Sequence, residues 1–103
     1  MMQEEKWRRT ARERVERGVA FIENTFGRDR LYGIDQTVDI ESGFNCALAR
    51  VTDMFYADAI KVHRLEERAP SLGFVGDENC PMPILTEVWR ARSSRRCTLI
   101  ASA

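Results

Sequence analysis

A chain of 103 residues and 11.9 kDa can bury one modest core, so we expect a single domain spanning residues 1–103. Hydrophobic residues make up 44% and charged residues 31%, which excludes a disordered chain and is typical of a soluble globular protein. The 16 basic residues balance the 16 acidic ones, and a net charge of zero argues against a wholly basic nucleic-acid-binding protein.

The first predicted element is a long helix over residues 3–26. This segment lacks proline, is rich in glutamate and arginine, and ends at Gly27, a typical helix C-terminal residue; Gly18 is its one unfavourable position. An apolar stripe about 120° wide runs along it and suits an intramolecular core. Its spacing also approaches a coiled-coil seam, and we expect a homodimer. The candidate self-association face is Trp7, Ala11, Val15, Gly18 and Ile22.

Residues 28–41 are predicted to form a connector. Gly33 and the polar run 35–37 interrupt it, and only residues 38–40 alternate in the manner of a very short strand. Its apolar residues are too numerous for a free linker, so we expect the connector to be tucked over the helices. These residues are Leu31, Tyr32, Ile34, Val38 and Ile40.

A second long helix is predicted over residues 42–68, with Ser42 as its N-cap. Asp58 lies near the centre of its apolar stripe, and the alternative is a break near residues 56–58 with Asp58 capping a separate helix. Small and apolar residues on the opposite face indicate that this helix is covered on both sides or faces a partner. The stripe consists of Phe44, Leu48, Val51, Phe55, Ala59 and Val62.

Proline residues delimit the last elements. Pro70 is expected to end the preceding helix, and residues 70–77 have the composition of a turn-rich loop. Pro83 is suited to begin a final helix over residues 84–96. Residues 97–103 are apolar without periodicity and would form either a small edge strand or a tail that docks only in an oligomer. The predicted fold is therefore mostly α, with about three helices, a tucked connector and at most a minor short strand.

The sequence carries no motif of a catalytic, metal or nucleotide site. His63 is the only histidine, and Cys46, Cys80 and Cys97 lack the spacing of metal-binding or redox pairs. We therefore predict no enzyme, no catalytic residue, no metal, no cofactor and no small-molecule substrate. The odd number of cysteines, with no signal peptide or membrane-spanning stretch, favours a cytoplasmic protein that does not bind membranes.

Charge is unevenly distributed along the chain. Residues 31–60 hold five acidic residues and one basic residue, Arg50, whereas residues 91–103 hold three arginines and no acid. If the first and last helices lie side by side, their arginines would track a phosphate backbone, and nucleic-acid binding is the alternative function. The candidate basic surface is Arg8, Arg12, Arg14, Arg92, Arg95 and Arg96.

Several short runs along the chain are Gly18-Val19-Ala20-Phe21-Ile22, Val38-Asp39-Ile40, Asn45-Cys46-Ala47-Leu48, Leu72-Gly73-Phe74 and Leu85-Thr86-Glu87-Val88-Trp89. Over about residues 18–92 this pattern resembles small proteins of unassigned function from actinobacteria and their phages. Arg50 departs from that set, which often has glutamine or another polar residue there. The resemblance implies a phage or actinobacterial accessory protein without catalytic residues. We expect a non-enzymatic interaction module that self-associates, binds a host protein, or does both.

Overall fold

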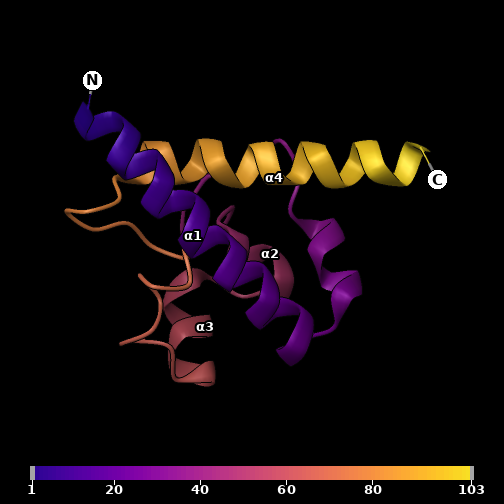
Figure 1. The fold of residues 1–103 in the computed structure, drawn as a ribbon. Coiled ribbons are helices and arrows are strands. Elements are labelled where there is room, and N and C mark those ends of the chain that lie inside the picture. The colour runs from indigo at the N-terminus through magenta and orange to yellow at the C-terminus, as the bar shows by residue number, and fades with distance from the viewer. Residues whose placement is uncertain (1, 103) are drawn as a thin grey trace.

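The computed structural model describes the backbone of residues 2–102 and the side chains of residues 3–93. Over these residues the chain forms five helical segments and no sheet, which confirms the mostly α prediction (Figure 1). A single antiparallel bridge joins Asp77 to Cys80 within the described part of the chain. The segments are α1 (Met2–Thr25), the 3₁₀ helix η1 (Arg28–Gly33), α2 (Ala47–Thr52), α3 (Tyr56–His63) and α4 (Met82–Ser102).

Helix α1 agrees with the predicted first helix and ends where expected. Gly27 has a positive φ of 99°, and its N–H donates to the Ile22 carbonyl at 3.1 Å, as is typical where a helix ends. The apolar stripe of α1 faces the chain's own core, where α1 crosses α4 (Figure 1). Ala11, Val15 and Ile22 are at most 1% exposed. The apolar stripe of α1 therefore packs in the core of the same chain.

Gly18 lies at the most crowded point of α1. A Cβ atom built on Gly18 would lie 2.1 Å from the Leu72 carbonyl oxygen and 3.1 Å from the Trp89 ring. Carbon and oxygen atoms do not approach to 2.1 Å without a shift of the backbone. The glycine that weakens the helix by propensity is therefore required for the loop after α3 to pack against α1.

The connector is tucked as predicted, except at Tyr32, which is 59% exposed. Its apolar residues Leu31, Ile34 and Val38 are at most 2% exposed, and its backbone is bound to α4. The Ser93 hydroxyl donates to the Ile34 carbonyl at 2.8 Å, and Arg90 Nε donates to the Val38 carbonyl at 2.8 Å. Residues 28–33 form η1, and residues 38–40 do not form the short strand that their alternation suggested.

The prediction of one long helix over residues 42–68 is wrong, because two short helices occupy this region. Helix α2 ends at Asp53, which has a left-handed φ of 57°, and α3 begins at Tyr56. The alternative of a break is correct in kind, but Asp58 lies in the first turn of α3 and Phe55 is the N-cap. Both short helices bury apolar residues in the same core, Leu48 and Val51 from α2 and Ala59 and Ile60 from α3.

Ser42 is not the N-cap that the sequence suggested. Its Oγ accepts hydrogen bonds from the N–H groups of Phe44 and Asn45, at 3.3 and 3.2 Å, and so holds a turn. The N-cap of α2 is Cys46, whose Sγ accepts from the Ala49 N–H at 3.4 Å. Helix α2 therefore begins four residues later than a serine cap would have placed it.

Helix α4 is longer than predicted. It begins at Met82, one residue before Pro83, and its backbone remains helical to Ser102, so the expected end at residue 96 and the edge-strand alternative are both wrong. Trp89 anchors the helix: its ring is 1% exposed and stacks on Phe74, and its Nε1 donates to the Gly73 carbonyl at 2.6 Å. The loop after α3 is thereby held between α1 and α4.

Candidate protein-interaction surface

Three large apolar side chains gather on the outside of the molecule. Phe44 is 64% exposed, Phe55 55% and Met54 37%. The rings of Phe44 and Phe55 meet edge to face with centroids 4.9 Å apart, and Phe44 and Met54 line the same depression. We call these three residues the aromatic patch. Clustered exposed aromatic residues of this kind are typical of surfaces that contact another protein.

The backbone around the aromatic patch is held in place. The Tyr56 N–H donates to the Gly43 carbonyl at 2.7 Å, which joins the start of α3 to the turn that carries Phe44. The Ser42 turn orients Phe44 from the other side. Phe44 and Phe55 therefore project from two short segments that are hydrogen-bonded to each other.

A cavity of about 150 Å³ adjoins the aromatic patch. One wall is apolar and the other carries an amide, a guanidinium and a carboxylate. A cavity of this size can hold one side chain of a partner and offers it both apolar contact and hydrogen bonds. Its lining residues are Phe44, Asn45, Ala49, Arg50, Asp53 and Met54.

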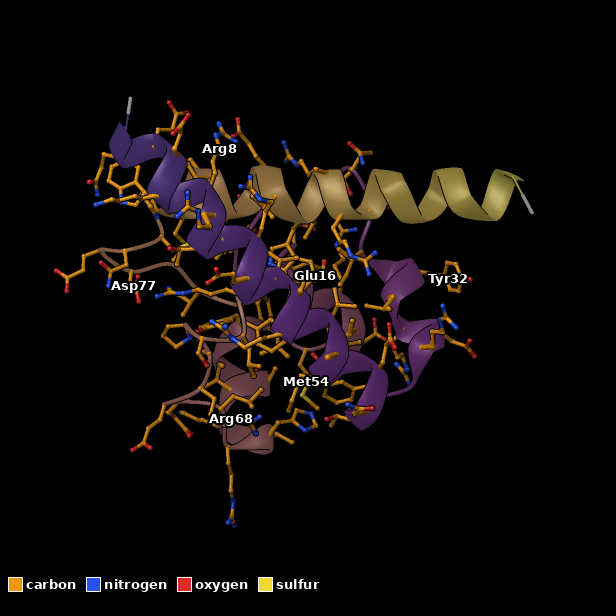
Figure 2. The ribbon with its side chains drawn as sticks, in the orientation of Figure 1. Arg8, Glu16, Tyr32, Met54, Arg68 and Asp77 are labelled. Carbon is orange, nitrogen blue, oxygen red and sulfur yellow. The ribbon has the colours of Figure 1, made fainter. Side chains whose placement is uncertain are left out.

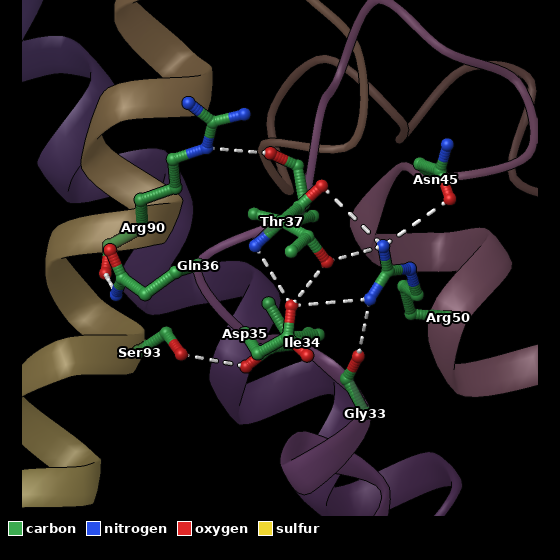
Figure 3. A network of polar contacts seen from close by, with 10 residues as sticks. Gly33, Ile34, Asp35, Gln36, Thr37, Asn45, Arg50, Arg90 and Ser93 are labelled. Atoms are coloured by element: carbon green, nitrogen blue, oxygen red, sulfur yellow. Dashed lines mark hydrogen bonds and ion pairs between the residues drawn. The ribbon is translucent and has the colours of Figure 1, made fainter.

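Arg50 forms the polar wall and binds the connector (Figure 3). Its Nη1 donates to the Gly33 carbonyl at 3.4 Å and to Asp35 Oδ1 at 3.3 Å. Its Nη2 donates to Thr37 Oγ1 at 2.8 Å and to Asn45 Oδ1 at 3.3 Å. Because these acceptors take up both terminal nitrogens, Arg50 supports the shape of the cavity rather than offering a free cation.

Asp35 is the acidic partner in this network. Its Oδ1 accepts from the hydroxyl and the N–H of Thr37, at 2.5 and 2.8 Å, and these bonds, together with the Arg50 charge, lower the pKa of the Asp35 carboxyl. A lowered pKa in the folded state means that the carboxylate stabilises the fold above its ordinary pKa of 3.8. That contribution is lost as pH falls through the lower folded-state value.

Replacing Arg50 with methionine is expected to lower the free energy of unfolding by about 1 kcal/mol at neutral pH, because several solvent-exposed acceptors on the connector lose charge-assisted bonds that water only partly replaces. Chemical denaturation followed by circular dichroism measures this. The stability difference between the two proteins is expected to shrink below pH 3.8, where Asp35 begins to take up its proton. A difference that stays constant down to complete protonation would contradict the contribution of the Asp35–Arg50 pair.

Sequence reasoning did not find the aromatic patch. It placed Phe44 and Phe55 on the buried stripe of one long helix, but they are exposed, as is Val62 at 60%. Leu48 and Val51 of the same stripe are buried as expected. The alternative of a break near residues 56–58 came closest, but the break lies after Asp53 and removes Phe55 from the helical register of Leu48.

The candidate self-association face lies inside the chain. Ala11, Val15 and Ile22 are in the core, and Gly18 contacts the loop after α3. Trp7 is half-buried, and its Nε1 is buried without a hydrogen-bond partner among the described residues. A charged residue at Val15 would disrupt this core whether or not the chain dimerises, so such a variant does not test the dimer.

The candidate basic surface is largely neutralised by acidic partners. Arg8 Nη2 lies 3.0 Å from a Glu4 carboxylate oxygen and 2.8 Å from one of Glu87, and Arg92 Nε lies 2.6 Å from Glu16 Oε2. Helices α1 and α4 do lie together, but Arg8 and Arg92 meet carboxylates of the same chain, and Figure 2 shows Arg8 beside the start of α4. Arg12 is exposed. The side chains of Arg95 and Arg96 lie outside the described residues.

Arg14 of the candidate basic surface is also paired. Its Nη1 lies 3.0 Å from Asp77 Oδ1. Burial acts to raise the pKa of the Asp77 carboxyl, but the adjacent Arg14 guanidinium and the N–H of Asn79 outweigh it, and the net shift is downward. Asp77 is therefore held as a carboxylate that balances the Arg14 charge.

The described cysteine and histidine side chains lie in separate, packed environments. Cys46 and Cys80 are buried free thiols, and burial raises the pKa of each. His63 packs edge-on against Phe26, with ring centroids 4.9 Å apart. Among the described residues, no three His, Cys, Asp or Glu side chains gather in a way that could hold a metal ion.

None of the helices in the described part of the chain is long and apolar enough to cross a membrane. The chain matches no protein-family model, and neither a curated protein nor a solved structure matches it. We therefore derive a function from the chain's own surface.

Proposed function

We propose that this chain is a non-enzymatic protein-interaction module that binds a basic, apolar segment of a partner protein on its aromatic patch. The observation that carries the proposal is the exposed pair Phe44 and Phe55, held by backbone hydrogen bonds beside a cavity of about 150 Å³. Aromatic anchors next to a cavity are the usual centre of binding energy in protein interfaces.

Charge selects the class of partner. Residues 31–60, which include the aromatic patch, hold five acidic residues. The one cation in this range, Arg50, is bound to the connector. Asp53 lines the cavity, and no hydrogen bond or ion pair involves its carboxylate among the described residues. Two copies meeting patch to patch would bring their Asp53 carboxylates close together, which is unfavourable. A partner that carries lysine or arginine beside apolar residues fits better than a second copy.

The cellular setting proposed is cytoplasmic. Cys46 and Cys80 are free and buried, which suits a reducing compartment. The resemblance of residues 18–92 to small actinobacterial and phage proteins supports an accessory protein that binds a host protein.

The proposal is tested with a short capped peptide of alternating leucine and arginine, titrated against the full chain by calorimetry. We expect salt-sensitive binding that weakens about tenfold or more in Phe44→Ser and in Phe55→Ser, because an aromatic anchor is lost. Tyr32→Ser is the matched control, since Tyr32 is 59% exposed on η1, and it should bind as the unmodified chain does.

Two outcomes would overturn this assignment. Equal binding of a peptide in which glutamate replaces arginine would show that charge does not select the partner. A solution mass of two chains by light scattering that returns to 11.9 kDa in Phe55→Ser would show that a second copy occupies the aromatic patch.

A further inference from the structure

A second depression lies between the C-terminal half of α1 and the loop after α3. It encloses about 480 Å³ and is open to solvent, a volume within the range of small-molecule sites. We call it the arginine groove. Its lining residues are Arg17, Ala20, Phe21, Asn24, Thr25, Arg68 and Leu72.

The two arginines of this groove differ from those of the candidate basic surface. Arg17 Nε donates to the Ser71 carbonyl at 2.9 Å, which fixes the guanidinium and leaves its two terminal nitrogens without a bond to any described residue. The Arg68 guanidinium lies 5.1 Å from the centre of the Phe21 ring. Neither arginine forms an ion pair with a described carboxylate, whereas Arg8 and Arg92 do.

The groove combines this charge with apolar surface. Phe21 and Leu72 supply an aromatic and an aliphatic wall, and Phe21 is braced by edge contacts to Phe26 and Phe74 at 6.0 Å. Asn24 and Thr25 add an amide and a hydroxyl that can donate to an oxyanion. Guanidinium groups bind carboxylates and phosphates with their terminal nitrogens.

We propose that the arginine groove binds a small organic oxyanion, a carboxylate or phosphate joined to an aromatic or branched apolar group. The terminal nitrogens of Arg17 and Arg68 hold the oxyanion, and Phe21 and Leu72 contact the apolar part. This site uses none of the residues of the aromatic patch, so either proposal can fail without the other.

Phenyl phosphate is the first probe, followed in ¹H–¹⁵N spectra of the full chain, with benzoate as the carboxylate arm and benzyl alcohol as the uncharged ring. We expect phenyl phosphate or benzoate to shift the amide signals of residues 20–25 and 71–73, and benzyl alcohol to leave them in place. The stronger of the two anions identifies the oxyanion class.

Arg68→Gln is expected to weaken that binding about fivefold or more, because one charge-assisted contact is lost. The Arg68 side chain makes no hydrogen bond to a described residue, so this variant should retain the fold. Arg17→Gln should weaken binding similarly, and Arg12→Gln, an exposed arginine elsewhere on α1, should not. No shift of the groove signals with either anion, or an equal loss in Arg12→Gln, would overturn the proposal.

Discussion

Replacing Gly18 with alanine is expected to lower the free energy of unfolding by about 2–3 kcal/mol, although alanine is the better helix former by about 1 kcal/mol. The added Cβ would lie 2.1 Å from the Leu72 carbonyl oxygen. Because that atom belongs to the backbone, the loop after α3 must move away from α1 to relieve the contact. Chemical denaturation followed by circular dichroism measures the change.

The matched control is Ala20→Gly on an exposed position of the same helix. It should cost about 1 kcal/mol or less, the ordinary propensity difference without any steric contact. Both substitutions are then destabilising, although Gly18→Ala adds a methyl group and Ala20→Gly removes one. A Gly18→Ala protein as stable as the unmodified chain would show that the loop does not pack against α1 at this point.

Replacing Trp89 with phenylalanine is expected to cost about 2–4 kcal/mol. The substitution removes the Nε1 donor of the 2.6 Å bond to the Gly73 carbonyl and leaves a void in the core, since Trp89 is 1% exposed. The carbonyl of a buried loop then has no donor in place of the indole. Circular dichroism is the suitable measurement because tryptophan fluorescence changes with the substitution itself.

Trp7→Phe is the control for Trp89→Phe, because it also removes an indole ring but no hydrogen bond to a described residue. The Nε1 of Trp7 is buried without a partner among the described residues, so this exchange removes an unsatisfied donor and should cost at most about 1 kcal/mol. Equal losses in Trp7→Phe and Trp89→Phe would contradict the role assigned to the bond between Trp89 and Gly73.

Helix α1 and the start of α4 were predictable from local signals, whereas the end of α4 was not. Helix α1 has good propensity, a regular stripe and a glycine at its end, and the start of α4 lies near Pro83. The connector was recognisable because Leu31, Ile34 and Val38 are too apolar to remain exposed. Each of these features is set by residues within a few turns of one another.

The middle of the chain was not predictable in the same way. The apolar spacing from Phe44 to Val62 fits one helix, yet Phe44 lies in the turn before α2 and Phe55 lies in the break before α3, and both are exposed. Capping added to the error, because Cys46 caps α2 while Ser42 holds a turn. Either Ser42 or Cys46 could have capped a helix by the local sequence, and the packing of α2 in the core favours the cap at Cys46.

The sequence by itself determined the helical class, the extent of α1, the tucked connector and the acidic middle of the chain, because propensity, periodicity and charge are local properties. Only the tertiary structure decided that Gly18 is required, that Arg8, Arg14 and Arg92 meet carboxylates, and that an aromatic patch and an arginine groove lie on the surface. These features join residues far apart in the chain, and their contacts depend on how the helices cross.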